Sequence, residues 1–167
     1  MNKYVAIAKE AIENYVKGGK VISTDTAKDN QAGCFVSIHK KNGELRGCIG
    51  TILPTCKSVT AEIINNAISA CQDPRFEKIQ KYELDNLEVS VDVLSKPEPI
   101  DSPKSLQPKK YGVIVKAKDG RTGLLLPDLE GVDETSDQIS IAREKAGILP
   151  NEPIYLYRFE AMRYHED

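Results

Sequence analysis

Two tight-turn dipeptides, Asn42-Gly43 and Asp119-Gly120, constrain the fold of this chain more than any other feature. Each lies between two strand-like runs, which are residues 33–39 and 45–52 for the first and residues 111–117 and 122–126 for the second. Asn-Gly and Asp-Gly favour the short turns of β-hairpins because these residues accept positive φ. Strands that follow each other as hairpins pair antiparallel. The sequence therefore predicts an α+β fold with a largely antiparallel sheet and flanking helices.

Helical periodicity predicts two helices in the first half of the chain. Apolar residues recur every three or four positions between residues 4 and 16, and Gly18-Gly19 offers a left-handed cap. Ser58 is expected to cap a second helix, whose apolar stripe leaves Glu62 and Asn66 outside the core. The polar residues 23–31, between the two helices, predict a surface loop.

In the second half, Thr135-x-x-Gln138 fits a capping box and predicts a helix over residues 136–146, closed by Gly147. Alternating apolar residues predict two further strands, at residues 87–93 and 154–159. Residues 95–110 hold four of the nine prolines and are expected to form a structured connection between strands.

Composition excludes several classes of function. The formal net charge of −2 disfavours a nucleic-acid surface, because phosphate binding depends on clustered Lys and Arg. The sequence has no apolar run of signal-peptide or transmembrane type, which predicts a cytoplasmic protein without membrane association. The four cysteines form no C-x-x-C pair and there are only two histidines, so we expect free thiols and no metal site.

A two-residue first turn would set the register of its hairpin. Ser37 would then lie opposite Cys48, and His39 opposite Arg46. Because side chains alternate across a sheet, these four would share one face, close enough to touch. The other face would be apolar and suited to a core, with Val36, Ile38, Leu45 and Ile49.

Cys48 and Arg46 are the candidate catalytic residues of this face. A positive charge favours the thiolate, so Arg46 would lower the pKa of Cys48 and support nucleophilic chemistry. Gly47 and Gly50 are unusual inside a strand and often mark a close approach of a ligand or of another backbone. Together with Ser37, these glycines are candidate ligand-binding residues.

An inert role is the alternative for the same residues. A free cysteine usually behaves as a small buried hydrophobe, the arginine can be a surface charge, and the glycines can serve close packing. The strand pattern alone gives this structural interpretation the larger weight. His39, next to two lysines, is expected to be a solvated side chain.

A second motif, Asp73-Pro74-Arg75-Phe76, follows the helix that Pro74 must end. Asp73 can accept backbone N–H groups, and Arg75 could bind a carboxylate or phosphate, so both are candidate ligand-binding residues. Phe76 is expected to anchor the segment in the core. The alternative is an internal pair between Asp73 and Arg75 that only fixes the turn.

Taken in order, five segments of the sequence resemble the AMMECR domain family, whose prokaryotic branch is called AmmeMemoRadiSam system protein A. The segments are G-C-F-V-S from residue 33, L-R-G-C-I-G-T from residue 45, D-P-R-F from residue 73, G-L-L-L-P from residue 123 and K-A-G from residue 145. The resemblance covers nearly the whole chain, and its L-R-G-C-I-G-T string is the most specific part.

This resemblance implies an α+β fold of two unequal lobes, with a cleft into which the R-G-C-I-G motif looks, and residues 1–167 as one AMMECR domain. It implies a Memo-like protein and a radical SAM protein as partners, but it fixes neither a reaction nor a cofactor. Family members often carry a Trp after K-A-G-L, whereas this chain has no Trp, which puts any ligand contact of that aromatic in doubt.

Two classes of function follow. The chain is either an enzyme or enzyme component that acts with these partners through Cys48 and Arg46, or a non-catalytic module that binds a small anionic ligand or a partner protein. The radical step itself is not expected here, because the sequence has no C-x-x-x-C-x-x-C motif for an iron–sulfur cluster.

Overall fold

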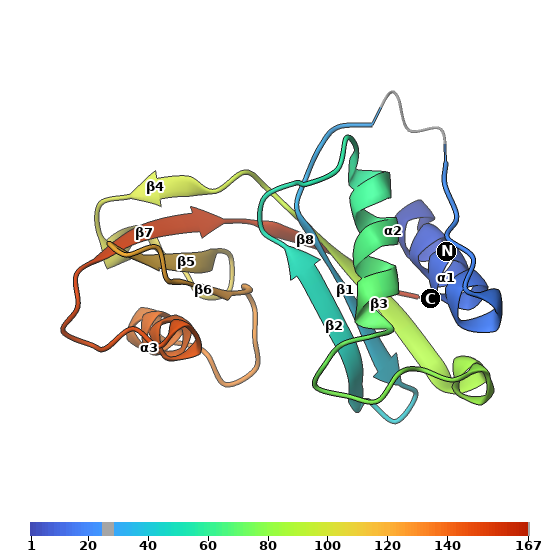
Figure 1. Cartoon of the computed structure of the whole chain (residues 1–167). Coiled ribbons are helices and arrows are strands. Elements are labelled where there is room, and N and C mark those ends of the chain that lie inside the picture. Colours follow the sequence, from blue (N-terminus) through green and yellow to red (C-terminus); the bar gives the residue numbers. More distant parts are fainter. Residues whose placement is uncertain (25–28, 167) are drawn as a thin grey trace. The chain divides into compact units, whose positions relative to one another are not determined.

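The structure, a computed structural model, describes residues 1–24 and 29–166 (Figure 1). The chain divides into two compact units, of which the first is Met1–Leu94 with Met162–Asp167 and the second is Ser95–Ala161. Each unit has its own four-stranded sheet, so the predicted α+β class is confirmed with two antiparallel sheets in place of one. Residues 25–28, at the centre of the predicted surface loop, lie outside the described residues.

The first unit is a sheet with two helices on one face. Its elements are α1 (Lys3–Gly18), β1 (Cys34–Lys40), β2 (Leu45–Thr51), α2 (Val59–Ala70), the short 3-10 helix η1 (Lys81–Asn86), β3 (Leu87–Leu94) and β8 (Ala161–Tyr164). The strand order is β2-β1-β3-β8, which leaves β2 at an edge. α2 packs on β1 and β2, and α1 packs on α2 and β3 (Figure 1). Aliphatic side chains form the core of this unit.

Local capping explains where both helices begin and end. The side chain of Asn2 accepts a hydrogen bond from the Tyr4 N–H at 2.8 Å, and α1 ends at Gly19 with φ of 67°, as its two glycines predicted. The Ser58 side chain accepts from the Ala61 N–H at 3.1 Å, which confirms the predicted cap of α2.

Two polar side chains of α2 lie in the core, and their predicted position outside it is wrong. Glu62 is 0% exposed and Asn66 is 3% exposed. Asn66 donates to the Cys34 carbonyl at 3.1 Å, while Glu62 accepts from Thr51 Oγ1 at 3.1 Å and Thr55 Oγ1 at 2.8 Å. These hydrogen bonds make burial of the two polar groups tolerable.

The second unit is a sheet covered by one helix. Its elements are β4 (Glu98–Ile100), the 3-10 helix η2 (Pro103–Ser105), β5 (Gly112–Ala117), β6 (Thr122–Leu125), α3 (Thr135–Ala146) and β7 (Ile154–Phe159), with strand order β4-β7-β5-β6. α3 lies so close to β6 that a Cβ on Gly123 would be 2.0 Å from the Ala142 carbonyl oxygen. The proline-rich residues 95–110 belong to this unit, because they contain β4 and η2.

The predicted capping box of α3 is wrong. The helix begins at Thr135, and its N-cap residue Glu134 makes no side-chain cap bond. Gln138 is fully buried and donates to the Tyr111 carbonyl at 2.7 Å, so this side chain joins the helix to the sheet. The other end is confirmed, because Gly147 has φ of 68°.

Candidate functional site

The hairpin of β1 and β2 brings Ser37 and Cys48 together, as predicted. The two residues are directly opposed, with Ser37 Oγ and Cys48 Sγ 3.3 Å apart. The predicted pairing of His39 with Arg46 is wrong, because His39 faces Leu45. The turn is one residue longer than predicted, and a bulge at Arg46 absorbs the difference in register.

Arg46 does not share a face with Cys48. Its guanidinium binds Glu83 of η1 in a bidentate pair, with Nε to Oε1 at 2.8 Å and Nη2 to Oε2 at 3.1 Å. This hydrogen bonding lowers the pKa of Glu83, against the effect of burial. Arg46 also lies near the buried Cys71, where burial raises the pKa of the thiol to about 12 and Arg46 opposes it. The predicted pairing of Arg46 with Cys48 is therefore wrong.

The second motif meets Cys48 instead. Asp73 Oδ2 accepts the Cys48 backbone N–H at 3.0 Å, and Arg75 Nη2 donates to the Cys48 carbonyl at 3.4 Å. Because β2 is an edge strand, its outward N–H and C=O groups have no neighbouring strand to bind. The turn at residues 73–75 supplies these partners, so the second motif holds a residue of the first that lies 25 positions earlier in the sequence.

Asp73 and Arg75 also form the internal pair that was the alternative interpretation. Arg75 Nε lies 3.1 Å from Asp73 Oδ1, and Arg75 Nη2 lies 2.7 Å from Asp73 Oδ2. Hydrogen bonding from Arg75 is the main reason that the pKa of Asp73 is far below its usual range. Phe76 is only partly buried, below the Arg75 guanidinium at 5.4 Å, so its predicted anchoring in the core is wrong.

The predicted lowering of the Cys48 pKa is also wrong. Burial raises this pKa, and the hydrogen bond with Ser37 and the charge of Arg75 offset burial only in part. Asp92 and Asp73 add to the increase because their negative charges disfavour a thiolate. These effects disfavour the thiolate, which is the reactive form of a cysteine.

Internal packing accounts for Gly47 and Gly50. A Cβ on Gly47 would lie 2.3 Å from the Ala70 carbonyl oxygen at the end of α2. A Cβ on Gly50 would lie 2.3 Å from the ring of Phe35, which covers this glycine from the neighbouring strand. Both positions thus have the close-packing role that the sequence allowed as an alternative.

Two polar residues of β3 complete the surroundings of Cys48 and were missed as site residues. Ser90 is directly opposite Ser37, and Asp92 is opposite Phe35. Asp92 is 2% exposed and forms an ion pair with Arg163 at 2.8 Å. The alternation of β3 predicted a polar face, but it could not show that β1 would be the neighbouring strand.

We call this side of the sheet the Cys48 face and define it by Ser37, Cys48, Ser90 and Asp92. Strand alternation places it opposite the side of the sheet on which α1 and α2 pack. A thiol and two hydroxyls form a row across β2, β1 and β3. Such a row can donate and accept hydrogen bonds, and Asp73 and Arg75 fix its outermost member.

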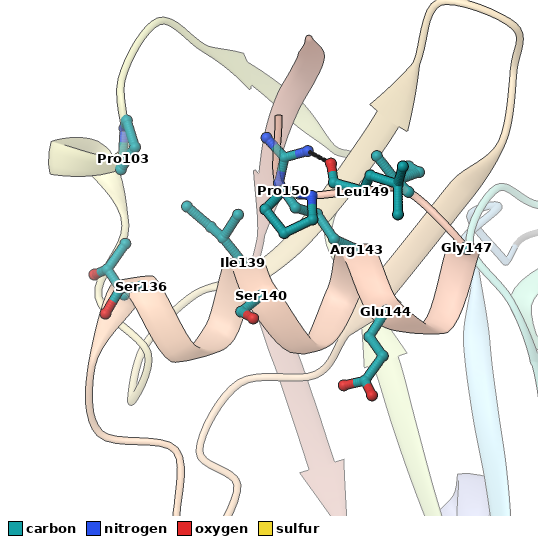
Figure 2. Close-up of a pocket in the computed structure, with 11 residues that line it drawn as sticks. Pro103, Ser136, Ile139, Ser140, Arg143, Glu144, Gly147, Leu149 and Pro150 are labelled. Atoms are coloured by element: carbon teal, nitrogen blue, oxygen red, sulfur yellow. Dashed lines mark hydrogen bonds between the residues drawn. The ribbon is translucent and has the colours of Figure 1, made fainter. Parts of the chain in front are cut away.

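The second unit has a separate hollow of about 830 Å³ along α3 (Figure 2). Ile139, Leu149 and Pro150 supply apolar lining. Arg143, the one cation in the described lining, donates through Nη1 to the carbonyls of Leu149 and Glu152 at 2.8 and 2.9 Å. No sequence signal pointed to this hollow, and its cation is engaged by the backbone.

The described residues contain no group of three or more His, Cys, Asp and Glu side chains placed to hold a metal ion. All four cysteines are free thiols. Within the same residues, every helix is too short or too polar to cross a membrane.

Comparisons with known proteins agree with the fold and with the family resemblance. A protein from Thermotoga maritima is 51% identical, over 96% of each chain. A Clostridium acetobutylicum protein is 44% identical over 98% of this chain, which spans only 36% of that longer protein. The crystal structure of the uncharacterized protein PH0010 from Pyrococcus horikoshii superposes with a TM-score of 0.89 at 33% identity, over 98% of this chain and 90% of that one. The AMMECR1 family model matches residues 5–164, and the chain belongs to this family.

Proposed function

We propose that this chain is a component of a multiprotein enzyme system, in which it acts with a Memo-like protein and a radical SAM protein through the Cys48 face. Membership of the AMMECR1 family supports these partners by resemblance. The Clostridium acetobutylicum relative supports joint action with other domains, because it carries a similar region within a much longer chain. We place the chain in the cytoplasm, where reducing conditions keep its thiols free.

The contact between the second motif and Cys48 of the first motif carries this proposal. Asp73 and Arg75 engage both polar groups of the Cys48 backbone, at 3.0 and 3.4 Å. A functional side chain works best when neighbouring groups fix its position before the ligand arrives. Ser37 then orients the thiol itself, at 3.3 Å. This arrangement suits a group that must meet a partner or substrate in one defined position.

The raised pKa of Cys48 supports recognition over nucleophilic catalysis as the role of this thiol. A protonated thiol is a poor nucleophile, because the thiolate is the reactive species. The thiol of this chain therefore serves to recognise a partner or substrate. Any nucleophilic step would require a bound partner that removes the thiol proton. A raised thiol pKa thus supports the binding-module form of the proposal over catalysis by the isolated chain.

Capture of the two partners tests the proposal. The tagged chain is mixed with a Memo-like and a radical SAM protein of the same organism, and retained protein and activity of the mixture are measured. Cys48→Ala, Ser37→Ala and Ser90→Ala are expected to reduce capture. Cys56→Ala is the matched control, because Cys56 is also a partly buried free thiol.

The outcomes separate the alternatives. Capture that survives Cys48→Ala while activity of the mixture disappears assigns a catalytic role to the thiol. Loss of both capture and activity assigns a binding role. If Cys48→Ala behaves like Cys56→Ala in both measurements, the proposal is wrong.

A further inference from the structure

A smaller hollow of about 380 Å³ lies beside η1 in the first unit. Its walls come from the hairpin of β1 and β2, from the segment after Pro74 and from η1 itself. The volume falls within the range of about 300–1,000 Å³ that is usual for small-molecule sites. The lining includes Arg46 but not Cys48, so each of these neighbouring motif residues faces a different environment.

Arg46 is the buried charged group of this hollow. The residue is 8% exposed, and its Nε and Nη2 are engaged by Glu83. Its remaining nitrogen, Nη1, has no hydrogen-bond partner in the described part of the chain. Among the described residues, Gln138 Oε1 is the one fully buried side-chain nitrogen or oxygen that has no hydrogen-bond partner. Arg46 Nη1 has no partner either but is not fully buried, so it is in contact with solvent. Arg46 therefore lines the hollow with a guanidinium that keeps one nitrogen, and its pair of N–H donors, unpaired.

The charges of the lining limit what this donor can bind. Three cations and three acids line the hollow: Lys40, Arg46, Lys78, Glu44, Glu77 and Glu83. Glu83 is neutralised by Arg46, and Glu44 is paired with Lys40 at 3.3 Å. With these charges balanced, the site favours a ligand with one negative charge over a polyanion such as a nucleotide.

Besides Gln80, the rest of the lining consists of three large side chains that are apolar or aromatic, Leu45, Phe76 and Tyr82. Phe76 is partly buried, Leu45 is 38% exposed and Tyr82 is 84% exposed. A tyrosine so exposed beside a hollow is available to cover an aromatic or other planar ligand. Arginine matches carboxylate geometry particularly well, so the charged end of the ligand belongs at Arg46.

We propose that this hollow binds a small monocarboxylate with a flat apolar body, whose carboxylate accepts from Arg46 Nη1 and whose body packs against Phe76 and Tyr82. This site is separate from the Cys48 face and does not depend on the function proposed for it. The proposed ligand is a small molecule, and a hollow lined by a buried donor suits a small molecule better than a flat protein surface does.

Benzoate is a direct probe, because it combines one carboxylate with a planar ring. In ¹⁵N–¹H spectra of the full chain, benzoate is expected to shift the Arg46 Nε–H and backbone amides of residues 76–83, with a dissociation constant of about 1 mM. Benzyl alcohol has the ring without the charge and is expected to bind at least about tenfold more weakly, because a charge-assisted bond is lost.

Tyr82→Ala is the principal variant because this exposed side chain can be removed without disturbing the core. It is expected to weaken benzoate binding about threefold to tenfold, as removal of an aromatic contact does. Lys110→Ala is the control, because Lys110 is an exposed lysine of the other unit. Any one of three results overturns the proposal: no shift at residues 76–83, equal shifts with benzyl alcohol, or unchanged benzoate binding in Tyr82→Ala.

Discussion

Replacement of Arg46 by methionine tests whether this residue is an internal structural partner. The change keeps an unbranched apolar stem and removes the guanidinium that binds Glu83. Two unit charges about 4 Å apart attract by roughly 4 kcal/mol at an effective dielectric constant of about 20. Side-chain exposures of 10% and 17% let little water in, so Arg46→Met is expected to destabilise the fold by about 2–4 kcal/mol.

The assay is urea unfolding of a double-mutant cycle with Glu83→Gln. Residues in direct contact couple by about 0.5–3 kcal/mol, so the double variant should be less destabilised than the sum of the single variants. Free energies of unfolding that add without coupling would refute the internal pair. In that case the Arg46 side chain would be free to contact the Cys48 face.

The same pair gives a pH dependence of stability with a definite sign. Arg46 lowers the pKa of Glu83 in the folded chain. Its stabilisation is therefore fully present above the ordinary glutamate pKa of about 4.3 and is lost as the pH falls through the lower folded-state pKa. Arg46→Met should lose less stability on acidification than the unaltered chain. Identical losses in both chains would contradict the pairing.

Three further predictions concern Cys48, Gly47 and Glu62. Site-resolved alkylation of Cys48 should reach half of its maximal rate at a pH above the free-thiol pKa of about 8.5, and a midpoint at or below this value would contradict the raised pKa. Gly47→Ala should destabilise the fold by about 1–3 kcal/mol because its Cβ meets the Ala70 carbonyl, whereas Gly18→Ala has open space; equal unfolding midpoints would refute this packing. Glu62→Gln should cost about 1–3 kcal/mol in urea unfolding, since an amide cannot accept all its donors, and an unchanged midpoint would count against it.

The sequence predicted the position of Cys48 better than that of Arg46, and the β1–β2 hairpin explains why. The turn is one residue longer than its Asn-Gly pair suggested, but the bulge restores the register beyond it. Ser37 therefore still faces Cys48. Arg46 is the bulged residue, and a one-residue bulge has no reliable sequence signal of its own.

Burial of polar residues was the second weakness of prediction from sequence. Glu62 and Asn66 lie three and seven positions after Val59, on the same side of α2, so their spacing was compatible with the core. Their polarity outweighed their spacing in the prediction, because the partners that satisfy them come from β1, β2 and the following loop. Long-range partners of this kind become visible only once the fold is known.

Amide hydrogen exchange at Cys48 tests the central claim, that the turn at residues 73–75 holds this residue in place. An outward amide on an edge strand normally exchanges quickly, because water is its partner. The Asp73 carboxylate is expected to protect the Cys48 amide as well as the paired amides of β1, and Asp73→Ala should abolish this protection. Rapid exchange in the unaltered chain, or protection that survives Asp73→Ala, would contradict the account.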